Sequence, residues 1–238
     1  MPACPQEPRV QRLVKFLSQI LILAFLSPAA YAGSIMLTPA SSGQSLNEQV
    51  ELLEDKGAKL NIADMSDPAV QQRFTPAHGK ASVGQSANPW WIKVTLSAAA
   101  DAPKQWWLEI ASVTLLDLQL YLPDGQGAWQ MRQSGERVSF AEGRDYPHRR
   151  MLLRLPELSE QPLTLYLRTY DPAGNSFPLK AWQLDDLKSQ ISGENLLLGL
   201  IYGVITALLL YNLFIFLALR DSAYFWYVVT TTGALLMI

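Results

Sequence analysis

Hydrophobic and polar positions alternate along much of the middle of the chain. Residues 116–122, 151–155 and 163–167 place leucine or methionine at every second position. A period of two predicts β-strands that bury one face, and Pro-, Asp- and Gly-containing turns follow these segments. Because short strands succeed one another with little helix between them, we predict a mainly β domain, a jelly-roll-like antiparallel β-sandwich, followed by α-helical transmembrane segments.

Two segments of this region depart from the strand pattern. Residues 66–74 contain a cap followed by Pro68 at a first helical position, which predicts a short helix. Residues 45–55 fit two interpretations, because Ser45 and Glu48 have the spacing of a capping box whereas the second half of the segment fits a strand.

Toward its end the chain becomes continuously apolar. No charged side chain lies between Asn195 and Leu219, and a helix needs about 20 apolar residues to cross the hydrocarbon core of a bilayer. After a short polar turn at Arg220-Asp221 the sequence is apolar again up to Ile238. We therefore predict that residues 194–238 hold a first transmembrane helix and an incomplete second one.

Another apolar run lies near the N-terminus. Basic residues within 9–15 precede apolar residues 16–26, and Ala30 and Ala32 form the small-x-small pattern that signal peptidase recognises. We interpret residues 1–32 as a signal peptide, although an uncleaved anchor fits the same pattern. Either way residues 33–193 form a periplasmic domain, and we expect a multi-pass protein of the bacterial inner membrane that contacts membrane lipid.

Composition limits the metals, cofactors and partners that the exported domain is expected to bind. Cys4 is the only cysteine and lies in the predicted signal peptide, and His78 and His148 are the only imidazoles. We therefore expect no disulfide, no metal site and no cofactor in the mature chain. The formal net charge of −2 and the lack of a long basic run argue against nucleic acid as a partner.

Catalysis is also not expected in these residues. The sequence contains no nucleophile elbow, zincin helix or phosphate-binding loop. A tethered hydrolase would need paired carboxylates in one cleft, for which Asp171, Asp185, Asp186 and Glu194 are the candidates. Asp185-Asp186 lies beside the first apolar segment, however, and we interpret it as a solvated linker.

Two pairs of adjacent tryptophans suggest a ligand surface. Successive strand residues point to opposite faces, so Trp90-Trp91 and Trp106-Trp107 should each contribute one inward and one outward ring. An outward ring can stack on the apolar face of a sugar. The alternative is that each outward ring is covered by a loop, by a second domain or by the membrane-side helices.

The densest polar cluster of the exported part spans residues 144–150. Its guanidinium groups suit carboxylates and acidic sugars, although a solvated arginine-rich loop is the alternative. Aromatic faces and directional donors together make a small-ligand pocket. We therefore predict a site for a small periplasmic ligand, a sugar or a carboxylate, built from Trp91, Arg144, His148 and Arg168.

Several segments, in this order, resemble the type 2 extracellular domain and the membrane block of bacterial seven-transmembrane receptors with diverse intracellular signalling modules. The extracellular segments are Trp90-Trp91-Ile92-Lys93-Val94-Thr95-Leu96, Trp107-Leu108-Glu109-Ile110, Asp117-Leu118-Gln119-Leu120-Tyr121-Leu122-Pro123-Asp124-Gly125, Leu165-Tyr166-Leu167-Arg168 and Phe177-Pro178-Leu179, and the membrane segments are Gly199-Leu200-Ile201-Tyr202-Gly203 and Leu210-Tyr211-Asn212-Leu213-Phe214. The chain departs from the family at Lys93, where arginine is usual, and at Gly143, which precedes Arg144 where an acidic residue is commoner.

This resemblance implies a jelly-roll sensor similar to carbohydrate-binding modules, seven membrane helices and a histidine kinase, diguanylate cyclase or similar module beyond Ile238. We accordingly expect the N-terminal part of a signalling receptor that senses a periplasmic ligand, forms a homodimer and transmits the signal through its membrane helices. The alternative is a membrane-anchored protein-interaction or carbohydrate-binding module without its own signalling output.

Overall fold

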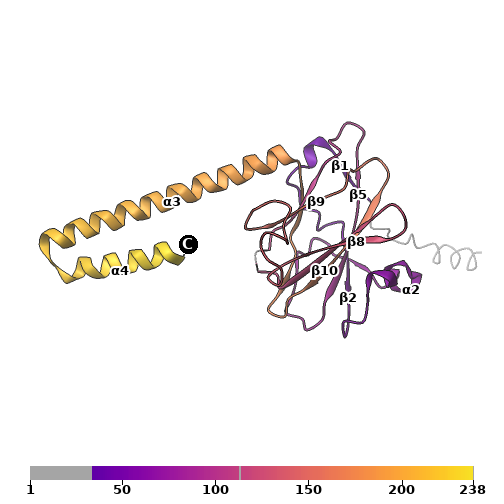
Figure 1. Cartoon of the computed structure of the whole chain (residues 1–238), viewed down its shortest axis with the longest axis horizontal. Helices are drawn as coiled ribbons and strands as arrows, with labels where there is room; N and C mark the ends of the chain where they lie inside the picture. Colours follow the sequence, from indigo (N-terminus) through magenta and orange to yellow (C-terminus); the bar gives the residue numbers. More distant parts are fainter. Residues whose placement is uncertain (1–33, 113, 238) are drawn as a thin grey trace, which may run out of the picture.

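The computed structural model describes residues 34–112 and 114–237. The predicted signal peptide, residues 1–32, lies outside the described residues. Figure 1 shows a β-rich body from which one long helix projects, followed by a second helix that folds back along the first. In chain order the elements are β1 (Ile35–Leu37), η1 (Pro39–Ser41), β2 (Glu51–Glu54), η2 (Ile62–Ser66), α2 (Pro68–Gln71), β3 (Thr75–Pro76), β4 (Ser82–Gly84), β5 (Trp90–Ala98), β6 (Trp107–Ile110), β7 (Asp117–Pro123), β8 (Trp129–Ser134), β9 (Met151–Arg154), β10 (Leu163–Tyr170), β11 (Asn175–Ser176), β12 (Leu179–Trp182), α3 (Leu184–Leu219) and α4 (Ser222–Met237).

The larger sheet has seven strands in the order β3-β2-β5-β10-β7-β8, with β1 also paired to β5. Its pairings are antiparallel except for that of β1 with β5, which is parallel. The segments predicted from alternation at 116–122, 151–155 and 163–167 correspond to β7, β9 and β10. The prediction of a mainly β, mostly antiparallel fold followed by helices is therefore confirmed.

The main core lies between this sheet and a three-stranded sheet with the order β12-β6-β9. The larger sheet contributes the alternating residues Ile92, Val94 and Leu96 of β5, and the smaller sheet contributes Leu108 and Ile110 of β6. All of these side chains are completely buried. Burial of apolar side chains on this scale, at about 1.5–3 kcal/mol for each large residue, is the main stabilising term of the sandwich.

A second apolar cluster covers the opposite face of the larger sheet. Met65 of η2, Val70 of α2 and Phe74 pack there against Trp91 and Tyr166. The predicted short helix is confirmed as α2, which begins at Pro68 after an Asp67 cap that accepts a hydrogen bond from the backbone N–H of Ala69 at 2.8 Å.

The second half of the ambiguous segment 45–55 forms a β-strand. β2 occupies Glu51–Glu54, and no helix forms at Ser45, which instead makes an isolated bridge with Lys180. The capping-box spacing of Ser45 and Glu48 therefore does not mark a helix start, because cross-strand pairing satisfies the backbone there.

Helix α3 is 36 residues long and is, among the described residues, the one helix whose length and composition suit a membrane crossing. It begins at Leu184, well before the apolar residues 195–219, so the expected domain boundary at residue 193 falls inside a continuous helix. Asp185 and Asp186 form the exposed first turn of this helix and are not a linker, and acidic side chains are favourable at a helix N-terminus. Residue Arg220 ends the helix in a left-handed conformation, and α4 then packs back on α3, with 5.6 Å between the ring centroids of Phe216 and Phe225 (Figure 1).

Candidate functional site: the junction between the sandwich and the membrane helix

The outer face of the three-stranded sheet is apolar although it points away from the main core. Because successive strand residues alternate, Trp107 of β6, Leu152 of β9 and Trp182 of β12 project outward while their neighbours fill the core. Leu187 and Ile191 of α3 pack on these side chains, and all five residues are buried. The first turns of α3 are therefore a covering element of the β-sandwich, and the apolar residues 195–219 continue from them.

The sequence of α3 explains why this part of the helix docks. Leu184, Leu187, Ile191 and Glu194 follow one another at intervals of three or four residues, so they form a single stripe along the helix. The stripe is apolar at its start and ends in a carboxylate. The exposed Lys188 and Ser189 lie on other sides of the helix.

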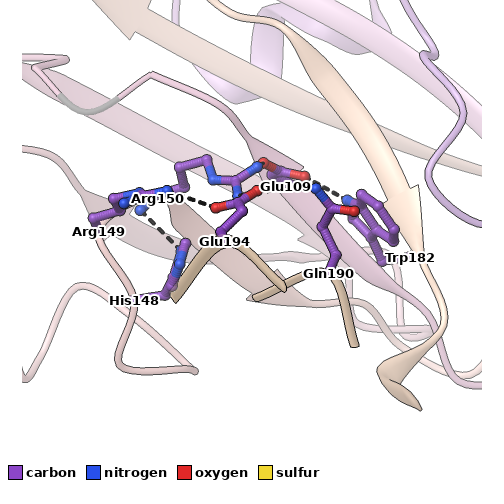
Figure 2. A network of polar contacts seen from close by, with 7 residues as sticks. All are labelled: Glu109, His148, Arg149, Arg150, Trp182, Gln190 and Glu194. Carbon is purple, nitrogen blue, oxygen red and sulfur yellow. Dashed lines mark hydrogen bonds and ion pairs between the residues drawn. The ribbon is translucent and has the colours of Figure 1, made fainter. Parts of the chain in front are cut away.

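An ion-pair network lies directly beside this apolar contact (Figure 2). Arg150, just before β9, donates from Nη1 to Glu109 Oε1 and from Nη2 to Glu194 Oε1. The Glu109 side chain is 0 % exposed, and its second oxygen accepts a hydrogen bond from the Trp182 indole N–H. One guanidinium thus joins a buried carboxylate of the sandwich to a carboxylate of the membrane helix.

Further contacts hold Glu194 in place. Arg149 Nη2 lies 2.6 Å from Glu194 Oε2, and Gln190 Nε2 donates to Glu194 Oε1 at 3.0 Å. Burial of Glu194 acts to raise its pKa, whereas the hydrogen bonds from Arg150 and Gln190 and the charges of Arg150 and Arg149 lower it, and the resulting pKa is about 2. The carboxylate is therefore ionised at neutral pH.

At neutral pH the Arg150 side chain is protonated and the His148 imidazole is neutral, because the pKa of Arg150 is raised and that of His148 is lowered. Burial acts to lower the pKa of Arg150, but hydrogen bonds to Glu194 and Glu109 and the charges of both carboxylates raise it. The pKa of His148 is lowered by burial and by the charges of Arg150 and Arg149. A neutral imidazole can accept a hydrogen bond, and His148 Nδ1 accepts one from the Arg150 backbone N–H at 3.2 Å (Figure 2).

The predicted outward ring of Trp91 is the clearest correction to the candidate ligand residues. Trp91 does lie on the face of β5 away from the main core, but its ring is 0 % exposed. The segment containing η2 and α2 covers it, and it stacks on Tyr121 with 5.5 Å between ring centroids. The expectation that Trp91 presents an accessible aromatic surface is therefore wrong, and the alternative in which a loop covers the ring is confirmed for this pair.

The second tryptophan pair behaves in the same way. Trp106 is completely buried in the main core, and its neighbour Trp107 faces outward beneath α3. Trp107 is thus covered by the membrane-side helix, which is another of the three alternatives that the sequence left open.

The remaining candidate residues divide into two places. Arg168 lies near Trp91, with 5.9 Å from its guanidinium carbon to the ring centroid, and its Nη2 is 3.9 Å from Asp55 Oδ2. Arg144 instead donates from Nη1 to the backbone carbonyl of His148. The contacts of the described residues thus join Trp91 with Arg168 and Arg144 with His148, but they do not link the two pairs.

Comparison with known protein families gives two consecutive matches. Residues 47–183 match the 7TMR-DISM extracellular 2 domain, and residues 194–238 match the 7TM diverse intracellular signalling region. The chain belongs to the 7TMR-DISM receptor family. No curated protein matches it. In this 7TMR-DISM receptor the extracellular match ends just before α3 begins and the membrane match begins at Glu194, so the docked turns of α3 lie where the two regions meet.

Proposed function

We propose that this chain is the sensing and first relaying part of a multi-pass receptor of the bacterial inner membrane. A small periplasmic ligand, a sugar or a carboxylate, binds the sandwich and changes how α3 docks on it. These residues act as a sensor, and the enzymatic output belongs to another part of the receptor. The observation that carries the proposal is that α3 runs without a break from its contact with Trp107, Leu152 and Trp182 into the apolar residues 195–219.

A continuous helix transmits displacement efficiently. At a rise of about 1.5 Å per residue, the 36 residues of α3 extend about 54 Å, which exceeds the thickness of the hydrocarbon core. A shift or rotation at the docked turns therefore reaches the far end of the helix, where α4 packs against it. Because the ion pairs to Glu194 are discrete contacts, the junction has two distinguishable arrangements, with Glu194 bound or released.

Ligand binding alters such an equilibrium only if the ligand prefers one arrangement. A coupling free energy of about 1–3 kcal/mol is typical of allosteric proteins. Of the predicted ligand residues, Arg144 and His148 belong to the loop that ends at Arg150, so a ligand held there is connected to the junction through a few residues of chain.

The test is hydrogen exchange measured by mass spectrometry on the whole chain in lipid nanodiscs, with panels of sugars and organic acids. We expect at least one compound both to raise the melting temperature of the sandwich and to change the exchange of amides 184–194. The Glu194→Gln variant should still bind that compound but should show a smaller change in those amides. A compound that stabilises the wild-type sandwich and leaves amides 184–194 unchanged would contradict the relay.

A further inference from the structure

A cavity of about 180 Å³ lies between the end of β8 and the start of β9. Its wall includes Ser134, Val138, Phe140, Gly143, Arg144 and Met151. Three of these residues are apolar, and the polar side chains of the wall are those of Ser134 and Arg144 together with Glu136 and Ser139. The cavity therefore combines an apolar wall with a small number of directional donors, which is the usual composition of a small-molecule site.

The hydroxyl of Ser134 is a polar group that the protein leaves unpaired. Ser134 is 2 % exposed, and its Oγ has no hydrogen-bond partner among the described residues. Gly143 lies against it, since a Cβ added at Gly143 would be 3.4 Å from Ser134 Oγ. Buried hydroxyls in native proteins nearly always have a partner, so the Ser134 hydroxyl, like that of Thr169, remains available to bond a group that reaches it.

Arg144 supplies a cation without a carboxylate partner. Its guanidinium carbon lies 4.4 Å from the centroid of the Phe140 ring, and its Nη1 donates to the His148 carbonyl. No ion pair within 4.0 Å joins Arg144 to a carboxylate in the part of the chain that the structure describes. Glu136, an exposed residue, also contributes to the wall but makes no such pair with Arg144. The guanidinium therefore has donors available for an anion.

We propose that this cavity binds the carboxylate of a small organic acid, with Arg144 as its cationic partner and Ser134 as a hydrogen-bond donor. The inference rests on the proposed function, because it names the ligand class and the position of the sensor site. A volume of about 180 Å³ corresponds to about six water molecules, so the cavity suits an acid with about that number of heavy atoms. The apolar residues Val138, Phe140 and Met151 would contact its short hydrocarbon part.

The position of Arg144 also explains how a ligand bound in the cavity would affect the membrane helix α3. The Arg144 guanidinium holds the His148 carbonyl, and His148 Nδ1 accepts from the Arg150 backbone N–H. Arg150 in turn holds Glu194 of α3. A carboxylate that binds the remaining donors of Arg144 draws the guanidinium toward the cavity and away from the His148 carbonyl, and it therefore changes the loop that positions Arg150.

The experiment is a titration of the whole chain in nanodiscs with propionate and with propionamide, its uncharged analogue, followed by ligand-observed NMR. Propionate should bind and propionamide should not. Arg144→Gln and Ser134→Ala should each weaken propionate binding by about tenfold or more, as expected for loss of a charge-assisted or buried hydrogen bond. Because Ser134 Oγ has no protein partner, Ser134→Ala should leave the melting temperature without ligand unchanged or higher. Arg137→Gln, a change at an exposed arginine of the same loop, is the matched control and should bind propionate as the wild type does.

Three results would each overturn the site. Propionamide could bind as well as propionate, Arg144→Gln could bind propionate with wild-type affinity, or propionate could fail to bind at all. Exchange of amides 184–194 separates this inference from the proposed function. If propionate binds through Arg144 and these amides do not respond, the site is supported and the relay is contradicted. If propionate does not bind but a sugar changes these amides, the relay is supported and this site is wrong.

Discussion

Replacing Arg150 with methionine tests the junction most directly. Arg150 is the cation that pairs with Glu109 among the described residues, and the Glu109 side chain is 0 % exposed. The substitution leaves this carboxylate buried with the Trp182 indole N–H as its remaining side-chain donor. Removal of one partner from a buried ion pair typically destabilises a protein by about 3–5 kcal/mol, and we expect a loss of unfolding free energy in that range.

Replacing Glu194 with glutamine should have a much smaller effect. The Glu194 side chain is 22 % exposed, and its loss leaves Arg150 paired with Glu109. A partly exposed pair of this kind contributes about 1 kcal/mol, less than the lowered pKa of Glu194 alone would give, because solvent screens the pair and glutamine keeps part of the hydrogen bonding. The two variants should therefore differ by at least about 2 kcal/mol, which is about 30-fold in the unfolding equilibrium constant. In the double variant Glu109→Gln with Arg150→Met no uncompensated buried charge remains, so it should be more stable than Arg150→Met alone.

The assay is urea unfolding of the whole chain in nanodiscs, followed by tryptophan fluorescence. Every tryptophan except Trp226 lies in the sandwich, so the signal reports the sensor domain. Arg132→Met is the matched control, because Arg132 pairs with Asp145 at 2.8 Å but the two side chains are 34 % and 33 % exposed. Its effect should stay below about 1 kcal/mol. If Arg150→Met destabilises the sandwich no more than Arg132→Met does, the junction is not a buried ion-pair network and the reasoning fails.

Three further predictions concern other parts of the molecule. Thr169 Oγ1 is buried without a partner among the described residues, so Thr169→Val should leave stability unchanged or raise it by about 1 kcal/mol in the same urea assay. Thr95→Val should lower stability by about 1 kcal/mol, because the Thr95 hydroxyl forms a hydrogen bond with that of Thr164 at 3.0 Å. A larger loss of stability in Thr169→Val than in Thr95→Val would contradict this view of the two hydroxyls. The folded-state pKa of Glu194 is about 2 and its ordinary value is 4.5, so its stabilising contribution is complete above the ordinary value and is lost as the pH falls through the folded value. Melting temperatures across this acidic range should therefore fall more for the wild type than for Glu194→Gln, and parallel curves would refute the shift. A phosphatase fused at Asp221 should be inactive and a fluorescent protein fused there should be bright, because the proposed orientation puts the turn after α3 on the cytoplasmic side. The reverse pattern would overturn this orientation.

Strand positions and the faces of their side chains were predictable because they depend on local geometry. Alternating leucines gave β7, β9 and β10. The same rule correctly predicted that adjacent tryptophans separate to opposite faces, with Trp90 packed against the main core and Trp91 on the other side. The period of the pattern is a property of a few consecutive residues, so no tertiary information is needed to read it.

Whether an outward side chain is exposed depends on residues far away in the chain, and the expectation of an accessible Trp91 ring is wrong for this reason. Trp91 is covered by Met65, Val70 and Phe74, and Trp107 is covered by Leu187 and Ile191. Neither contact has a local signature at the tryptophans. In both cases the buried residues of the covering segment alternate with exposed ones, so only one side of the segment packs on the tryptophan.

The junction was missed although part of its signal is present in the sequence. The stripe of Leu187, Ile191 and Glu194 has helical spacing immediately before the apolar segment. Asp185-Asp186 suggested a solvated linker, and the continuous charge-free stretch after Asn195 suggested that the helix begins there. The partner of the stripe could not be predicted, because Glu109 and Arg150 come together with it only through the pairing of β6 with β9.

The energetics of the junction limit the size of the movement that a ligand can cause. Release of Glu194 leaves Arg150 still paired with Glu109, so this step breaks two partly exposed pairs, with Arg150 and with Arg149, each worth about 1 kcal/mol. Detachment of the whole docked segment would also expose Leu187 and Ile191, at about 1.5–3 kcal/mol for each side chain. A ligand with a coupling free energy of about 1–3 kcal/mol is sufficient for the first step and not for the second. We therefore expect signalling to rotate or shift α3 about its apolar contact, with exchange changing near Glu194 more than near Leu187. Equal deprotection of both ends of the docked segment would instead indicate complete detachment.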